Sequence, residues 1–187
     1  NLTGVTIAGD GDGSVIQQLS LTENIFFGFN VSGLTIKNLK MVGPIPANGG
    51  TPPPGPGTGK GDGIYARSST DVTVTNCAFT GFVARPVDIW GCDRVHVTNN
   101  NFFANAEVST QYSGAEIYIG WDQFAANKPS SDIVVTGNVV SGNMTIGISI
   151  GFTPTKRVVC SDNIVLGTDL NGQEAVGAAL LRIKGIE

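Results

Sequence analysis

The chain has 187 residues, of which 14% are charged and 26 are glycines, and its formal net charge is −4. Charge is well below and glycine roughly twice the usage of an ordinary globular domain, which argues against a helical bundle, a coiled coil or an acidic disordered tail. A sequence pI of about 4.9 with scattered basic residues argues against a nucleic-acid partner. No apolar stretch reaches the ~18–20 residues of a membrane-spanning helix, so no membrane insertion is expected.

The N-terminal segment already follows a periodic apolar pattern at Val5-Thr6-Ile7. We therefore expect a single domain over residues 1–187 that is a piece of a longer polypeptide. Gly9-Asp10-Gly11-Asp12-Gly13 is predicted to be a glycine-rich turn between strands. Calcium is the alternative, because closely spaced Asp side chains supply oxygen ligands, but no acidic residue closes the loop. No other metal or cofactor is expected, and the three cysteines are predicted to be buried free thiols.

Five eight-residue segments share one pattern, with apolar residues at positions 1, 3 and 8. They begin at Leu34, Val72, Val95, Ile133 and Val158, with start-to-start spacings of 38, 23, 38 and 25 residues. Alternation with a period of two predicts strands that bury one face. A second family of short strands is predicted between these copies, at Ile64-Tyr65-Ala66, Val87-Asp88-Ile89, Ile117-Tyr118-Ile119, Ile148-Ser149-Ile150 and Leu181-Arg182-Ile183.

Like residues recur at the same phase in every copy, which predicts strands stacked parallel and in register, each coil ~4.8 Å above the last. A sandwich or barrel is the structural alternative, but it favours short hairpin turns. Asn100, Asn138 and Asn163 occupy position 6 and are predicted to form a hydrogen-bonded ladder in one bend, where Asn tolerates a left-handed backbone. Apolar positions of the repeat predict an inward core of Val72, Val74, Phe79, Val95, Val97, Phe102, Ile133, Val135, Val140, Val158 and Val165. His96, the only histidine, is expected to face solvent.

These segments resemble the right-handed parallel β-helices of the pectate-lyase-like superfamily over nearly the whole chain. The resemblance implies an all-β, single-stranded solenoid of about six coils, the scaffold shared by polygalacturonases and phage tailspikes. The polygalacturonase catalytic motifs are not matched. Asp62 keeps one residue of the family's Asn-Thr-Asp motif, whereas Ala84-Arg85 stands at its Asp pair and Ala115 at its histidine.

The segment 44–60 contains six of the nine prolines. It is predicted to be a Pro/Gly-rich loop insertion, because proline cannot donate to a strand ladder. Further insertions are predicted at residues 104–113 and 121–131. Insertions in solenoids often gather on the binding face.

The second strand family carries the candidate site on its outward positions. With its apolar residues inward, an outward strip is predicted to contain Tyr65, Arg67, Asp88, Trp90, Glu116, Tyr118, Ser149, Arg182 and Lys184, with Trp121 just beyond. Of these, Tyr65, Arg67, Trp90, Tyr118, Trp121 and Arg182 are the candidate substrate-binding residues. Aromatic rings stack on sugar faces and charged groups bind hydroxyls or uronates, so the strip fits a polysaccharide or surface glycan. A merely solvated face is the alternative.

Asp88 and Glu116 are the candidate catalytic residues. Their backbones are predicted to lie ~8 Å apart on adjacent coils, and inverting glycosidases hold their two carboxyl groups about 6.5–9.5 Å apart. One would protonate the leaving oxygen while the other activates water.

Two functional hypotheses stay open. The first is a polysaccharide-binding and polysaccharide-degrading β-helix of the glycosidase, lyase or tailspike depolymerase type. The second is a non-catalytic structural or adhesive shaft such as a phage tail fibre, which would be a homotrimer. Either hypothesis implies an extracellular or virion-surface location.

Overall fold

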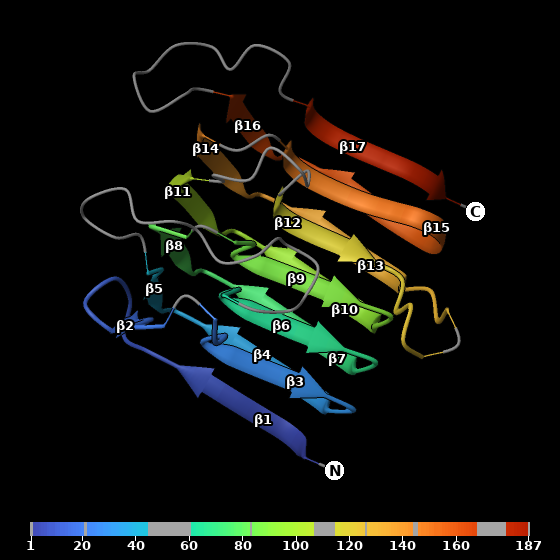
Figure 1. The fold of residues 1–187 in the computed structure, drawn as a ribbon, viewed down its shortest axis with the longest axis horizontal. Coiled ribbons are helices and arrows are strands. Elements are labelled where there is room, and N and C mark those ends of the chain that lie inside the picture. Colours follow the sequence, from blue (N-terminus) through green and yellow to red (C-terminus); the bar gives the residue numbers. More distant parts are fainter. Residues whose placement is uncertain are drawn as a thin grey trace.

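The computed structural model describes residues 2–20, 22–44, 61–82, 84–106, 115–125, 127–143, 146–167 and 179–186. Within these ranges the structure consists of strands and turns, and it contains no helix that could span a membrane. Figure 1 shows the strands stacked coil upon coil, from β1 near the N-terminus to β17 near the C-terminus. Apart from Pro44, the predicted loop insertion 44–60 lies outside the described residues, as does most of the predicted insertion 104–113.

Sheet A contains the first strand of each coil. Its members are β1 (Thr3–Ala8), β4 (Ser32–Lys37), β7 (Thr70–Thr75), β10 (Asp93–Thr98), β13 (Ser131–Thr136) and the second half of β15 (Ile146–Ser161). All neighbouring pairs are parallel and in register; Val95, for example, pairs with Val72 on one side and Ile133 on the other.

Two further parallel sheets complete each coil. Sheet B contains β2 (Val15–Gln17), β5 (Lys40–Val42), β8 (Ala78–Thr80), β11 (Asn101–Ala106), β14 (Val139–Asn143) and β16 (Ile164–Gly167). Sheet C contains β3 (Phe26–Phe29), β6 (Ile64–Arg67), β9 (Val87–Trp90), β12 (Ala115–Gly120), the first half of β15 and β17 (Ala179–Ile186). Because β15 runs from sheet C into sheet A, these two sheets form one 11-stranded sheet, beside the 6-stranded sheet B.

Each coil therefore has three strands rather than the two predicted. The eight-residue segment is divided between sheet A and sheet B, because its fifth residue has a left-handed backbone that bends the chain. The φ angles of these bend residues are Asn38 55°, Asn76 52°, Asn99 55°, Gly137 67° and Asp162 55°. Asn and Asp adopt this conformation more readily than most residues, and Gly has no Cβ to hinder it.

The predicted asparagine ladder is confirmed. Asn100 Nδ2 donates to Asn138 Oδ1 at 3.0 Å, and Asn138 Nδ2 donates to Asn163 Oδ1 at 2.9 Å. The predicted left-handed backbone was assigned one residue too late, because the preceding residue of each bend adopts it. The ladder residues instead satisfy buried backbone groups, as where Cys77 N–H donates to Asn100 Oδ1 at 2.9 Å.

The core lies inside the coils, as predicted. Of the expected residues, Val72, Val74, Phe79, Val95, Val97, Phe102, Ile133, Val135 and Val140 are buried, and the half-buried Val158 and Val165 pack against them. The rings of Phe79 and Phe102 stack with centroids 4.7 Å apart. His96 is exposed. Cys77, Cys92 and Cys160 are free thiols; the first two are buried, whereas Cys160 is half-buried.

A second ladder occupies the bend from sheet C to sheet A and was not predicted. Ser69 N–H donates to Cys92 Sγ at 3.4 Å, and Cys92 N–H donates to Ser130 Oγ at 3.1 Å. Small polar side chains thus satisfy buried amides where the chain changes sheet. Side-chain hydrogen bonds thus link successive coils at both bends that flank sheet A.

Candidate functional site

The outer face of sheet C presents the row predicted from the sequence. Tyr65 pairs with Asp88, Asp88 with Tyr118, and Tyr118 with Ser149. Arg182 follows beside Ser149 by backbone register. Phe27, on β3, precedes the row because it pairs with Tyr65, and the sequence analysis missed it.

Aromatic rings form a connected column along this row. The rings of Phe27 and Tyr65 stack with centroids 5.4 Å apart, and Tyr65 meets Trp90 edge-on at 6.2 Å. Trp90 contacts Tyr118 at 5.9 Å and stacks on Phe124 at 6.2 Å. Such pairs stabilise each other beyond the area they bury, so the column is a preformed surface.

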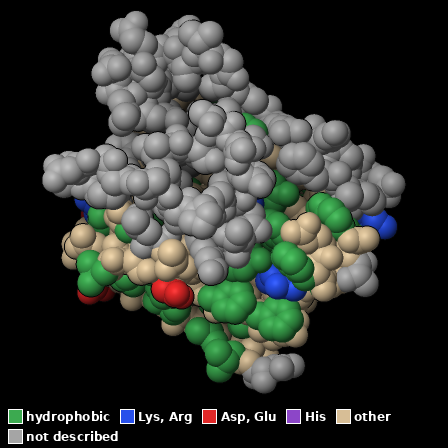
Figure 2. All heavy atoms as spheres, viewed as in Figure 1, with side chains coloured by type: hydrophobic (Ala, Val, Ile, Leu, Met, Phe, Trp, Pro, Cys, Tyr) green, Lys and Arg blue, Asp and Glu red, His purple; other side chains and the backbone are tan. Residues whose placement is uncertain are grey.

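Three phenylalanine side chains on this face are exposed to solvent. The exposed fractions are 61% for Phe27, 49% for Phe29 and 63% for Phe124. The Arg67 guanidinium lies between two of them, 5.2 Å from the Phe29 ring centroid and 4.7 Å from that of Phe124. We call Phe27, Phe29, Arg67 and Phe124 the aromatic platform. Figure 2 shows hydrophobic side chains gathered on this face, with basic side chains among them.

Buried Asp122 holds the platform in place. It accepts hydrogen bonds from Arg67 Nε at 2.8 Å, Ser68 Oγ at 2.7 Å and Phe124 N–H at 2.9 Å. Burial alone would raise the pKa of Asp122, but these hydrogen bonds outweigh it and lower the pKa. Trp121, predicted to bind substrate, is half-buried in the turn after β12 and takes no part in the ring pairs of the described residues.

Five of the predicted catalytic and substrate-binding residues are not exposed, and the sequence prediction was wrong about their exposure. Tyr65, Asp88, Trp90, Glu116 and Tyr118 are all buried. Three of them belong to a small apolar cluster outside the main core, with Ala115 and Ile146. The face therefore combines an exposed aromatic platform with buried polar groups.

Asp88 forms a buried ion pair. Arg85 Nη1 donates to its two carboxylate oxygens at 3.0 and 3.1 Å, and Trp90 Nε1 donates to Oδ1 at 2.6 Å. The Arg85 guanidinium also lies 3.9 Å from the centroid of the Tyr118 ring. Burial raises the pKa of Asp88, against the opposing effects of Arg85 and the Trp90 hydrogen bond.

Asp62 is the carboxyl group that interacts electrostatically with Asp88. Its Oδ1 accepts a hydrogen bond from Arg85 N–H at 3.1 Å. Burial, and then the negative charge of Asp88, raise the pKa of Asp62 well above its ordinary value. Two neighbouring buried carboxyl groups do not both ionise readily, and the ion pair with Arg85 favours ionisation of Asp88 over that of Asp62.

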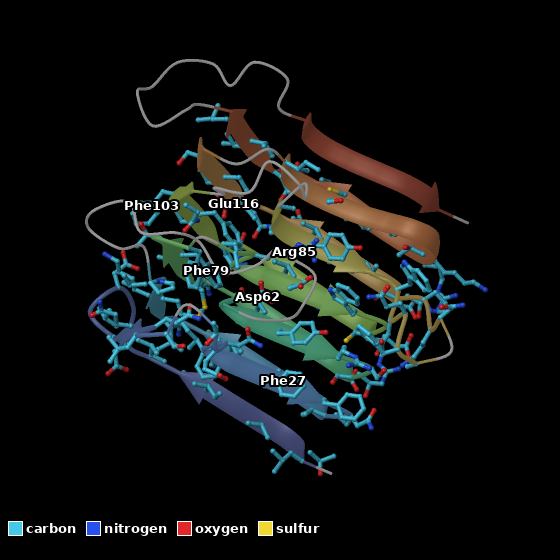
Figure 3. The ribbon with its side chains drawn as sticks, viewed as in Figure 1. Phe27, Asp62, Phe79, Arg85, Phe103 and Glu116 are labelled. Atoms are coloured by element: carbon cyan, nitrogen blue, oxygen red, sulfur yellow. The ribbon has the colours of Figure 1, made fainter. Side chains whose placement is uncertain are left out.

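Glu116 lies in a separate environment. Its Oε2 accepts a hydrogen bond from Asn105 Nδ2 at 2.8 Å, and Asn105 in turn accepts one from Phe82 N–H at 2.9 Å. Burial raises the pKa of Glu116 well above its ordinary value, opposed by the Asn105 hydrogen bond. The predicted catalytic pair therefore has different surroundings: Arg85 and Trp90 affect the pKa of Asp88, whereas Asn105 affects the pKa of Glu116. Figure 3 shows Asp62, Arg85 and Glu116 on this side of the molecule.

Four buried atoms on these coils have no hydrogen-bond partner among the described residues. They are Asp62 Oδ2, Arg85 Nε, Glu116 Oε1 and Ser149 Oγ, which we call the buried polar cluster. An unmatched buried polar atom costs about 1–3 kcal/mol. The buried polar cluster therefore has hydrogen-bonding capacity that the described side chains do not use.

The described residues contain no group of side chains arranged to bind a metal ion. Within the described part of the chain, no three His, Cys, Asp or Glu side chains lie close enough to hold a metal ion. The segment considered for calcium forms the predicted turn, in which Ser14 N–H donates to Gly11 O at 2.9 Å.

Three parallel sheets wound in successive coils define a parallel β-helix. A family model described as a right-handed β-helix region matches residues 2–184. The chain belongs to this family, and the predicted right-handed parallel β-helix is confirmed. No curated protein and no solved structure matches the chain.

Proposed function

We propose that the chain binds a polysaccharide along the outer face of sheet C. The observation that carries this proposal is the aromatic platform, in which the exposed Phe29 and Phe124 rings flank Arg67 and the exposed Phe27 ring stacks on Tyr65. Apolar side chains that gather into a contiguous exposed patch mark binding sites, whereas single scattered ones do not. The C–H faces of sugar rings stack on aromatic rings, and the neighbouring polar groups bind hydroxyls.

The charges of the site favour a neutral glycan. Arg67 is paired with Asp122, and Arg85 with Asp88. Burial raises the pKa of Asp62 and of Glu116, which disfavours the charged form of both carboxyl groups. The described side chains of this face thus carry little net charge, whereas binding of a polyuronate requires an excess of basic groups.

Binding to a panel of neutral and acidic polysaccharides tests the proposal. Replacing both Phe27 and Phe124 by Ala removes two exposed rings and should weaken binding about tenfold or more, because large buried aromatic contacts dominate recognition. Val159→Ala is the matched control, since Val159 is 53% exposed on sheet A. Equal affinities of the platform variant and the control would refute the proposal.

Cleavage of the bound glycan is a second candidate function. It is favoured by Asp62 and Glu116, whose raised pKa values and unpartnered oxygens suit a proton donor. Glu116 would protonate the leaving oxygen, while Asp88, held by Arg85, would be the ionised carboxylate that activates water.

A reducing-end assay separates cleavage from a non-catalytic adhesive shaft. Glu116→Gln keeps the hydrogen bond from Asn105 but cannot donate a carboxyl proton. If the protein cleaves, this variant should lose new chain ends and retain binding. If the unaltered protein binds the glycan but does not cleave it, the non-catalytic adhesive shaft is the remaining hypothesis. A homotrimer with an extracellular or virion-surface location belongs to that alternative.

A further inference from the structure

A polar pocket of about 300 Å³ opens on a different face, where sheet A bends into sheet B. Its lining includes Lys40 on β5, Ala78 on β8, and Asn101 and Phe103 on β11. Asn76, from the bend, and Asp12, from the turn between β1 and β2, also line the pocket. None of these residues takes part in the site on sheet C.

The pocket exists because a small residue, Ala78, lies between two longer side chains on neighbouring coils. Lys40, Ala78 and Asn101 pair in register on three successive coils. Adjacent parallel strands lie about 4.8 Å apart, so β5 and β11 are separated by ~9.6 Å. Ala78 ends at its Cβ atom and is buried at the pocket floor, while longer side chains stand on both sides.

The lining has the chemistry of a sugar site. The carboxamides of Asn76 and Asn101 each offer donors and an acceptor, as hydroxyl groups require. Phe103 is half-buried, and the Lys40 ammonium lies 5.9 Å from its ring centroid. An aromatic ring beside a few convergent polar groups is the usual composition of a small-molecule site.

Charge narrows the ligand class. Lys40 and Asp12 form no ion pair among the described residues, so the pocket holds one positive and one negative group. A phosphate or a polyuronate would need an excess of basic groups. An apolar ligand would leave the carboxamides unmatched.

We propose that this pocket is a second binding site, which holds one pyranose unit of a neutral glycan. Its hydroxyls bind Asn76 and Asn101, and one face of its ring packs on Phe103. The ligand class rests on the proposed function, but the site itself does not. Two sites on different faces would let one protein hold a polysaccharide at two points, which raises avidity without new contacts.

NMR titration of ¹⁵N-labelled protein tests this proposal, with cellohexaose, xylohexaose and laminarihexaose as neutral probes and hexagalacturonate as the acidic probe. The parent carries Phe27→Ala and Phe124→Ala, so that the platform and the pocket are measured separately. At least one neutral probe should shift the side-chain amide signals of Asn76 and Asn101.

Ala78→Leu fills the pocket and should weaken that binding about tenfold or more, because it removes the space that the ring occupies. Thr73→Leu, at an outward position of sheet A, is the matched control and should change it less than about twofold. Phe103→Leu gives the same comparison without adding bulk, if Ala78→Leu does not fold.

The proposal is overturned if no neutral probe shifts the Asn76 and Asn101 signals, if only hexagalacturonate does, or if the pocket variants bind as the parent does. If only the proposed binding at the aromatic platform is wrong, the titrations give a different result. The unaltered protein and the platform variant would then bind equally, with every shift confined to the pocket.

Discussion

Removing the central amide of the asparagine ladder, by Asn138→Ala, should strongly destabilise the protein. Asn138 is fully buried. Its Oδ1 accepts hydrogen bonds from Asn100 N–H at 3.1 Å and Asn100 Nδ2 at 3.0 Å. Its Nδ2 donates to Val97 O at 2.8 Å and Asn163 Oδ1 at 2.9 Å. Alanine removes these four bonds and the longer one from Asn138 Nδ2 to Thr136 O at 3.3 Å, and it leaves the Asn100 N–H without an acceptor.

The magnitude follows from these contacts. A stranded buried N–H costs about 1–3 kcal/mol, and each of the four further lost bonds costs about 0.5–1.5 kcal/mol, so the expected loss is about 3–9 kcal/mol. Urea unfolding followed by circular dichroism measures this difference. Asn101→Ala is the control, because Asn101 is exposed and its loss should cost less than about 0.5 kcal/mol. Equal losses for the two variants would refute a stabilising role for the ladder.

Three further predictions concern the core and the candidate site. Phe102→Ala should cost about 3–5 kcal/mol in urea unfolding, because the ring is fully buried. Burial raises the pKa of Glu116 in the folded protein above the value of about 4.5 that it has in the unfolded chain. The resulting contribution to the free energy of unfolding is fully present below pH 4.5 and is lost as the pH rises through the folded pKa. Glu116→Gln should therefore flatten that decline in a pH series of unfolding curves. Gly120→Ala should displace the Tyr118 ring from Trp90, since the new Cβ would lie 2.6 Å from the Tyr118 hydroxyl oxygen; near-UV circular dichroism reports the change.

Each of these predictions has a clear contrary result. A loss below about 1 kcal/mol for Phe102→Ala would place the ring outside a tightly packed core. An unchanged pH profile for Glu116→Gln would mean that the glutamate is not protonated by burial. An unaltered near-UV spectrum for Gly120→Ala would show that the Tyr118 ring does not cover Gly120.

The fold was largely predictable because its determinants are local and repeated. Apolar residues at fixed positions place the core, and Asn100, Asn138 and Asn163 recur at the same phase. The third strand of each coil was missed because sheet B strands are as short as three residues. A period-two pattern needs more residues than that to be recognised.

The candidate site was predictable only as a row of residues. Alternation places Tyr65, Asp88 and Tyr118 in register, but it does not show how deeply their side chains are buried. Phe27 was missed because Phe26-Phe27-Gly28-Phe29 lacks the polar alternation of the other copies. Phe124 was missed because it belongs to an insertion, whose turn depends on the hydrogen bonds of Asp122.

The partner of Asp88 was also beyond sequence reasoning. Arg85 was recognised only as a departure from the polygalacturonase pattern. In the structure it neutralises Asp88 and binds Asp62 through its backbone amide. Such a network depends on side-chain directions, which spacing along a strand does not determine.

A structure of the protein with the tightest-binding neutral oligosaccharide tests the central claim most directly. We expect a sugar ring in van der Waals contact with Phe27 or Phe124 of the aromatic platform. At least one of its hydroxyls should lie within hydrogen-bond distance of Arg67, the half-buried polar member of the platform. A ligand bound only on the outer face of sheet A, with the platform unoccupied, would contradict the account.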